Sequence, residues 1–121
     1  MAIRIFKRFF DTTAQVLDDI KTTGFWPTTL IAPASSELPL HWHDCEVHTY
    51  VIAGSTWTLD GVTGERVAME PGDKLVIPAG VLHAEGDTPA PVTYIVALPE
   101  PRPFGEFLTL LPPETAPTLT G

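Results

Sequence analysis

GDKLVIPAGVLH, residues 72–83, is the stretch that decides the fold of this chain. Its opening Gly-Asp pair provides a turn, and the four residues that follow it, 74–77, are typical of a short strand. Pro78-Ala79-Gly80 then predicts a tight bend that reverses the backbone. Because His83 begins the next strand three residues after this bend, we expect its imidazole to point back into the interior of a β structure.

A second histidine cluster, His41-Trp42-His43, lies 40 residues before His83. Side chains at positions i and i+2 of a strand share one face, so His41 and His43 can both reach one ion. His83, on a neighbouring strand, would complete a set of three imidazoles. Neutral imidazoles bind divalent transition metals, so the cofactor we expect is Fe, Zn, Ni, Cu or Mn.

The rest of the chain predicts an all-β protein. Short apolar runs separated by Pro, Gly and Asp are typical of an antiparallel sandwich or barrel. These runs cover residues 28–32, 40–44, 47–53, 56–59, 66–69, 74–77 and 92–98. Asp60-Gly61, after the fourth run, predicts a hairpin.

Three regions are expected along the chain. Residues 1–24 form an N-terminal arm and a short helix, which Asp11 or Thr12 caps and Gly24 ends. Residues 25–111 form the β-barrel, and its last apolar residues, Phe104, Phe107 and Leu108 among them, cover the barrel or a second subunit. The proline-rich residues 112–121 have nothing to bury, so we expect a flexible tail.

Composition excludes several classes of protein. The 121 residues suffice for one domain, and a formal net charge of -8 disfavours nucleic acid and anionic membrane surfaces as partners. Cys45 is the only cysteine, so no internal disulfide can form. The N-terminus lacks the pattern of a secretion signal, and no apolar run approaches the roughly 20 residues that span a bilayer. We therefore expect a cytoplasmic protein whose partner is a small molecule.

The two histidine segments resemble the paired signatures of the cupin superfamily. The second signature is matched at Gly72, Pro78, Gly80 and His83, with Asp87 where the family often has Asn, and the first is matched at His41, His43 and Gly54. The resemblance covers residues 39–98. It implies an antiparallel double-stranded β-helix, the jelly-roll barrel, with a metal inside. It also implies a homodimer, for which the Phe-rich N-terminal segment offers an apolar surface.

One ligand position of the first signature departs from the family. Val47 occupies the position that usually supplies a glutamate, with Glu46 and His48 on either side of it. A step of one residue reverses the face of a strand, so neither neighbour reaches the metal unless a bulge near Asp44 and Cys45 shifts the register. Three alternatives stay open: a three-histidine site completed by waters, a fourth ligand from His48 or Glu46, or weak binding. The simplest alternative to a metal site is a hydrogen-bonded histidine cluster that binds nothing.

Other residues near these segments have two interpretations each. Cys45 is either a small apolar core residue or a soft ligand. The aromatic residues Tyr50, Trp57 and Tyr94 either belong to the core or line a substrate pocket. Glu85 shares a strand face with His83 and is either surface charge or an acceptor for an imidazole N–H.

Two functions are compatible with these residues. The first is a metal-dependent enzyme acting on a small organic acid or dicarbonyl compound, with oxidative cleavage as the first reaction to consider and isomerisation the next. A narrower resemblance to three-histidine cupins, which include diketone-cleaving dioxygenases and sensor proteins, points in the same direction. The second is a non-catalytic binding or sensor module with a structural or ligand-reporting metal. The absence of an evident general base favours this second function.

Overall fold

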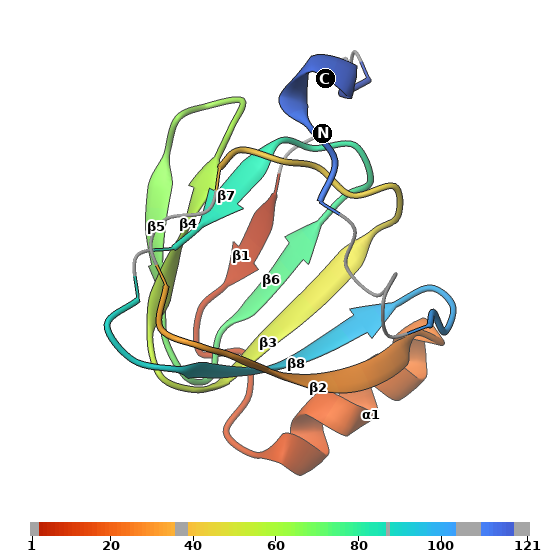
Figure 1. Cartoon of the computed structure of the whole chain (residues 1–121). Coiled ribbons are helices and arrows are strands. Elements are labelled where there is room, and N and C mark those ends of the chain that lie inside the picture. Colours follow the sequence, from red (N-terminus) through yellow and green to blue (C-terminus); the bar gives the residue numbers. More distant parts are fainter. Residues whose placement is uncertain (1–2, 36–38, 87, 104–109, 118–121) are drawn as a thin grey trace.

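Two antiparallel sheets enclose the core of the protein (Figure 1). The computed structural model describes residues 3–35, 39–86, 88–103 and 110–117. The larger sheet has five strands in the order β1 (Arg4–Phe6), β6 (Lys74–Ile77), β3 (Val47–Ala53), β8 (Val92–Leu98) and β2 (Trp26–Ala32). The smaller sheet has three strands in the order β5 (Arg66–Met69), β4 (Thr56–Asp60) and β7 (His83–Glu85). The prediction of a mostly β, antiparallel protein is confirmed.

Strand β3 shows how the alternation of side chains builds the two faces of the larger sheet. Val47 and Val51 point inward and pack in the core between the sheets. Tyr50 points outward and packs with a second, smaller cluster beneath the helix. Each face of β3 therefore has its own set of partners, and a residue's parity on the strand decides which set it joins.

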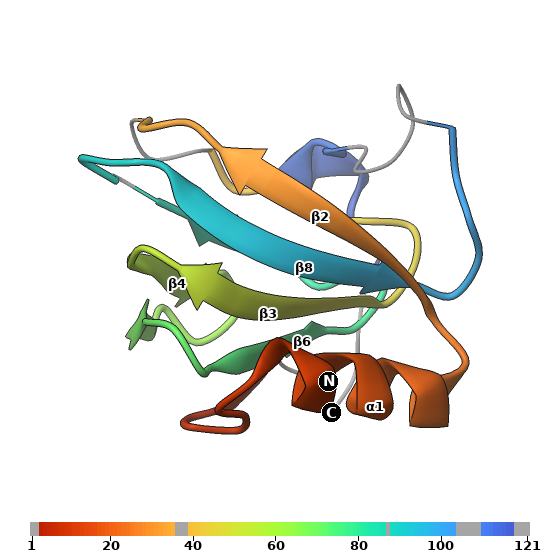
Figure 2. The ribbon, with the colours of Figure 1, turned by 90° about the horizontal axis from the view of Figure 1, so that it is seen from below.

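One helix, α1 (Thr13–Thr23), lies against the outer face of the five-stranded sheet (Figure 2). The hydroxyl of Thr12 accepts a hydrogen bond from the Gln15 N–H at 3.2 Å, and the Gln15 side chain accepts one from the Thr12 N–H at 3.1 Å. This reciprocal cap satisfies N–H groups that a helix start leaves free. At the other end Gly24 takes the left-handed conformation, with φ of 76°. The helix thus lies in the stretch where the sequence predicts one.

Most of the predicted runs are strands, but residues 40–44 are not a continuous one. His41 forms an isolated bridge with His83, and Trp42 forms one with Leu111. Because consecutive residues pair with different partners, no ladder can extend along the segment. The backbone is nevertheless extended enough at His41 to exchange hydrogen bonds with His83, His41 N to His83 O and His83 N to His41 O, both at 3.0 Å.

The described part of the C-terminal region is attached to the sheets through Trp42. The Trp42 indole donates to Pro112 O at 2.9 Å, and a short 3-10 turn follows at Pro113–Thr115. The expected flexible end at 118–121 lies outside the described residues, as do Phe104, Phe107, Leu108 and Asp87. Within the described ranges, no helix is long and apolar enough to cross a membrane.

Candidate metal centre

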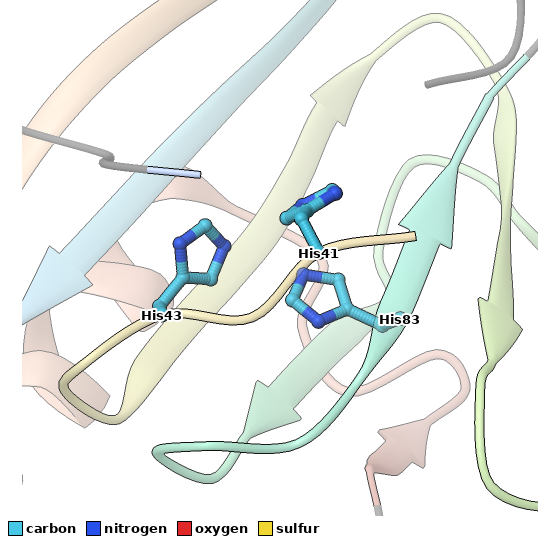
Figure 3. A group of neighbouring side chains, drawn as sticks. All are labelled: His41, His43 and His83. Atoms are coloured by element: carbon cyan, nitrogen blue, oxygen red, sulfur yellow. The ribbon is translucent and has the colours of Figure 1, made fainter. Parts of the chain in front are cut away.

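Three buried imidazoles, those of His41, His43 and His83, meet between the two sheets (Figure 3). His41 and His43 come from the segment that precedes β3, and His83 is the first residue of β7. The ring centroids of His41 and His83 are 4.4 Å apart, and that of His43 is 5.2 Å and 4.9 Å from them. One ligand atom from each residue lies within 4.8 Å of the other two. The fold therefore brings together the three histidines that the spacing of the sequence predicts as ligands.

Backbone carbonyls fix the tautomers of two of these rings. Nδ1 of His41 lies 2.8 Å from Pro39 O, and Nδ1 of His83 lies 2.9 Å from Val81 O. A carbonyl oxygen only accepts, so each Nδ1 carries the proton and donates it. In a neutral imidazole the Nε2 atom then keeps its lone pair, which is the form that binds a metal.

The residues present fit a divalent metal. Nε2 of His83 is buried and makes no hydrogen bond, which leaves a polar atom without compensation. Burial, with the neighbouring His83, lowers the pKa of His41 below its ordinary 6.5, although Pro39 O and Glu85 oppose this shift. His41 is therefore neutral near pH 7. Donors this close can share one ion with bonds of about 2.0–2.1 Å after small rotations of the rings.

His48 and Glu46, the two candidates for a fourth ligand, lie outside this group. Nε2 of His48 is 2.7 Å from Glu46 Oε2, and the His48 ring stacks on Phe25 with centroids 4.4 Å apart. The pairing of β3 with β6 runs without a shift from Val47 to Tyr50, so no bulge turns His48 inward. Val47, 2% exposed, packs in the core at the position where the family usually has its glutamate.

A cavity of about 240 Å³ adjoins the histidines. Its wall is mostly apolar, with the hydroxyl groups of one serine, four threonines and Tyr94 added; it includes Leu30, Val51, Met69, Val92, Val96, Ser35, Thr49, Thr56, Thr58 and Thr88. Of the three aromatic residues considered for a pocket, only Tyr94 is part of this wall, because Tyr50 faces α1 and Trp57 packs under the Arg66 guanidinium. Among the described residues of the lining there is no lysine or arginine. The wall of the cavity thus suits the uncharged part of a small molecule.

Glu85 is the one acidic residue among the described residues of this lining. Its Oε1 atom lies 3.4 Å from Nε2 of His83 and 4.0 Å from Nε2 of His41. Burial raises the pKa of Glu85, but the neighbouring histidines, His83 first, outweigh burial and lower the pKa below its ordinary 4.5. The sequence placed Glu85 on the face of His83 but did not show that its carboxylate points at the two imidazoles.

Cys45 is half-buried and packs against the core. Burial raises the pKa of its thiol, so the thiol stays protonated near pH 7. It is not part of the histidine group. These observations favour the interpretation of Cys45 as a small apolar residue.

Comparison with solved structures shows proteins of the same fold. A DUF861-family protein from Thermotoga maritima has a TM-score of 0.53 at 19% identity, covering 79% of this chain and 98% of that one. Acireductone dioxygenase from Bacillus anthracis, with a cadmium ion in its active centre, has a TM-score of 0.58 at 17% identity over 73% of this chain and 59% of that one. A polyketide cyclase from Streptomyces resistomycificus has a TM-score of 0.53 at 26% identity over 65% and 57% of the two chains.

The sequence itself matches one family. No curated protein sequence matches the chain. The family described as "Cupin domain" matches residues 28–97, which include both histidine segments and all strands from β3 to β7. The chain therefore belongs to the cupin family.

Proposed function

We propose that this cupin is a metal-dependent enzyme acting on a small dicarbonyl compound, and that with ferrous iron its reaction is oxidative cleavage. The observation that carries the proposal is the meeting of three buried imidazoles at the wall of a mostly apolar cavity. Three protein ligands leave positions on an ion for two substrate oxygens or for O2. When bound, a divalent metal supplies Lewis acidity and, as iron, oxygen activation.

The residues of the cavity select the substrate. Its volume of about 240 Å³ lies below the range of roughly 300–1,000 Å³ that is usual for drug-sized ligands, so the substrate is small. Apolar side chains exclude water and hold the hydrocarbon part, while the threonine hydroxyls can donate to a carbonyl oxygen. Without Lys or Arg in the described lining, a carboxylate that does not reach the metal has no cationic partner there. The cavity therefore favours the dicarbonyl over the organic acid that the sequence left open.

A reaction without O2 is the second candidate. The polyketide cyclase of Streptomyces resistomycificus, at 26% identity over 65% of this chain, is the observation that favours it. In that case the same site would polarise a carbonyl for cyclisation or isomerisation.

The experiment compares iron and zinc forms of the metal-depleted protein with acetylacetone and with a 1,2-dicarbonyl such as diacetyl. We expect O2 uptake, followed with an oxygen electrode, in the iron form only, and none in a variant carrying both His41→Ala and His43→Ala. Substrate loss without O2, in both metal forms, would replace cleavage with the second candidate. If neither substrate is consumed although metal binds, the protein is the non-catalytic binding module instead.

Three further expectations belong to this proposal. We propose that the two sheets close as the jelly-roll barrel of the family, that the chain forms a homodimer and that it works in the cytoplasm. The exposed Phe6 and Phe9 near the end of β1 support the dimer, because together they offer an apolar surface.

A further inference from the structure

We infer that Glu85 is the fourth protein ligand of the metal centre and replaces the glutamate that Val47 cannot supply. The inference rests on the proposed metal centre at His41, His43 and His83. It assigns the carboxylate to β7, on the smaller sheet, rather than to β3. Three observations support it: the distances from Glu85 to the histidines, the hydrogen bonds of the imidazole rings and the position of Glu85 on its strand.

Glu85 adjoins the candidate metal group of His41, His43 and His83, and its distance to His83 is that of two ligands around one ion. Two donors bonded at about 2.1 Å lie roughly 3.4 Å apart in a tetrahedral arrangement and about 3 Å apart at right angles. Oε1 of Glu85 is 3.4 Å from Nε2 of His83 and 4.0 Å from Nε2 of His41. The separation from His83 is therefore that of two ligands on one ion, and the longer separation from His41 closes with an adjustment of the Glu85 rotamer.

The hydrogen bonds made by Nδ1 of His41 and His83 leave the ring edges that face Glu85 available to a metal ion. The N–H groups of His41 and His83 already donate to Pro39 O and Val81 O, on the far sides of the rings. Glu85 faces the opposite edges, where neutral rings offer acceptors only. A cation between the carboxylate and these lone pairs would bind all three groups. The buried Nε2 of His83 makes no hydrogen bond, so a cation bound there would compensate this atom.

The strand position keeps Glu85 on the inside. Glu85 pairs with Thr58 across β7 and β4, and Thr58, 1% exposed, lines the same cavity. Directly paired residues share a face of the sheet. Glu85 itself keeps 31% of its side chain exposed, so it has room to adjust its rotamer around an ion. Glu46, by contrast, binds His48 on the outer face of the larger sheet.

The test compares Glu85→Gln with Glu46→Gln, a matched control that removes a carboxylate from beside a different imidazole. Zn²⁺ and Co²⁺ affinities would be measured by competition with a chromophoric chelator, and the visible spectrum of the cobalt form would report its ligands. We expect Glu85→Gln to weaken binding by more than about 100-fold, since even partners that only hydrogen-bond a ligand contribute 10–100-fold. The cobalt spectrum should change in this variant, whereas Glu46→Gln should keep the affinity within about twofold and the spectrum unchanged.

Metal-free protein supplies a second readout. The amide of Glu85→Gln can donate to Nε2 of His83, so the metal-free variant should melt at the same temperature as the parent or higher; a clear fall would show a structural role and overturn the inference. Unchanged affinity and spectrum in Glu85→Gln would also overturn it while leaving the metal centre intact, and so would weaker binding with an unchanged spectrum. A parent protein that binds neither metal would refute the centre itself.

Discussion

Asp73→Asn is the substitution whose effect on the free energy of unfolding the structure defines best. The Asp73 side chain is 1% exposed. Its Oδ1 atom accepts from the Arg8 N–H at 3.0 Å, and Oδ2 accepts from the Glu70 N–H at 2.9 Å and from the Lys7 ammonium. One carboxylate thus joins the segment after β1 to the turn between β5 and β6.

The expected loss of stability follows from this inventory. An asparagine amide keeps one acceptor oxygen, so one of the two backbone N–H groups loses its partner. A hydrogen bond to a charged group contributes about 1.5–3 kcal/mol. The Lys7 side chain is 44% exposed, so its ion pair adds no more than about 1 kcal/mol. We expect the free energy of unfolding to fall by roughly 2–4 kcal/mol and the melting temperature by about 8–16 °C, at roughly 4 °C per kcal/mol for a domain of this size.

The pH dependence of the loss has a definite sign. Burial raises the pKa of Asp73, but Lys7 and the N–H groups of Glu70 and Arg8 outweigh it and lower the pKa below its ordinary 3.8. A depressed pKa contributes stability that is complete above the unfolded value and is lost as the pH falls through the folded value. The difference between parent and Asp73→Asn should therefore be constant from pH 6 to 8 and shrink below about pH 4.

Urea unfolding followed by circular dichroism, at several pH values, measures both effects. Asp44→Asn is the control, because Asp44 is 57% exposed and pairs with Arg102 at 2.9 Å on the surface. Such a pair contributes about 0–1 kcal/mol. Equal losses for the two variants, or a loss at Asp73 that grows toward acid pH, would refute the reasoning.

Three further predictions concern a glycine, the metal and the assembly. Gly54→Ala places a Cβ 2.8 Å from Pro91 O, whereas the Cβ of Gly64→Ala meets nothing within 4 Å. Both glycines have positive φ, so the free energies of unfolding of the two variants, measured by thermal melts, should differ by the clash alone, about 1–3 kcal/mol. Equal values would contradict this prediction. Zn²⁺ at 100 times its dissociation constant should stabilise the parent by about 2.7 kcal/mol in a thermal melt, reversibly with a chelator, and leave the His41→Ala, His43→Ala variant unchanged. Light scattering at micromolar concentration should give twice the chain mass of 13.2 kDa, and the mass of one chain would count against the dimer.

The spacing of the histidines predicted the site because it depends on little else than extended backbone. His41 and His43 lie in a segment that is not a continuous strand, yet two extended residues suffice to bring both rings to His83. The alternation of inward and outward side chains along β3 could also be predicted from the sequence. If Val47 points inward, then His48 and Tyr50 point outward, and Tyr50 cannot line the cavity.

The chemistry around the histidines could not be predicted in the same way. The tautomers of His41 and His83 depend on carbonyl groups two residues earlier in the chain, whose direction no residue pattern reveals. For the same reason the sequence suggested Glu85 as an acceptor for an imidazole N–H. Only the structure shows that its carboxylate faces the Nε2 edges of the rings.

Charge connects Glu85 to the choice of substrate. A divalent ion beside an apolar wall is costly unless negative charge compensates it, and Glu85 is the one acidic residue in the described lining. With three neutral imidazoles and one carboxylate, the centre would keep a single positive charge. A dicarbonyl compound that has lost one proton is a monoanion with two adjacent oxygens, so its binding would bring the centre to neutrality. A dianion would leave an excess of negative charge that no Lys or Arg of the described lining could balance. The Glu85 carboxylate therefore favours a singly charged enolate over a doubly charged substrate.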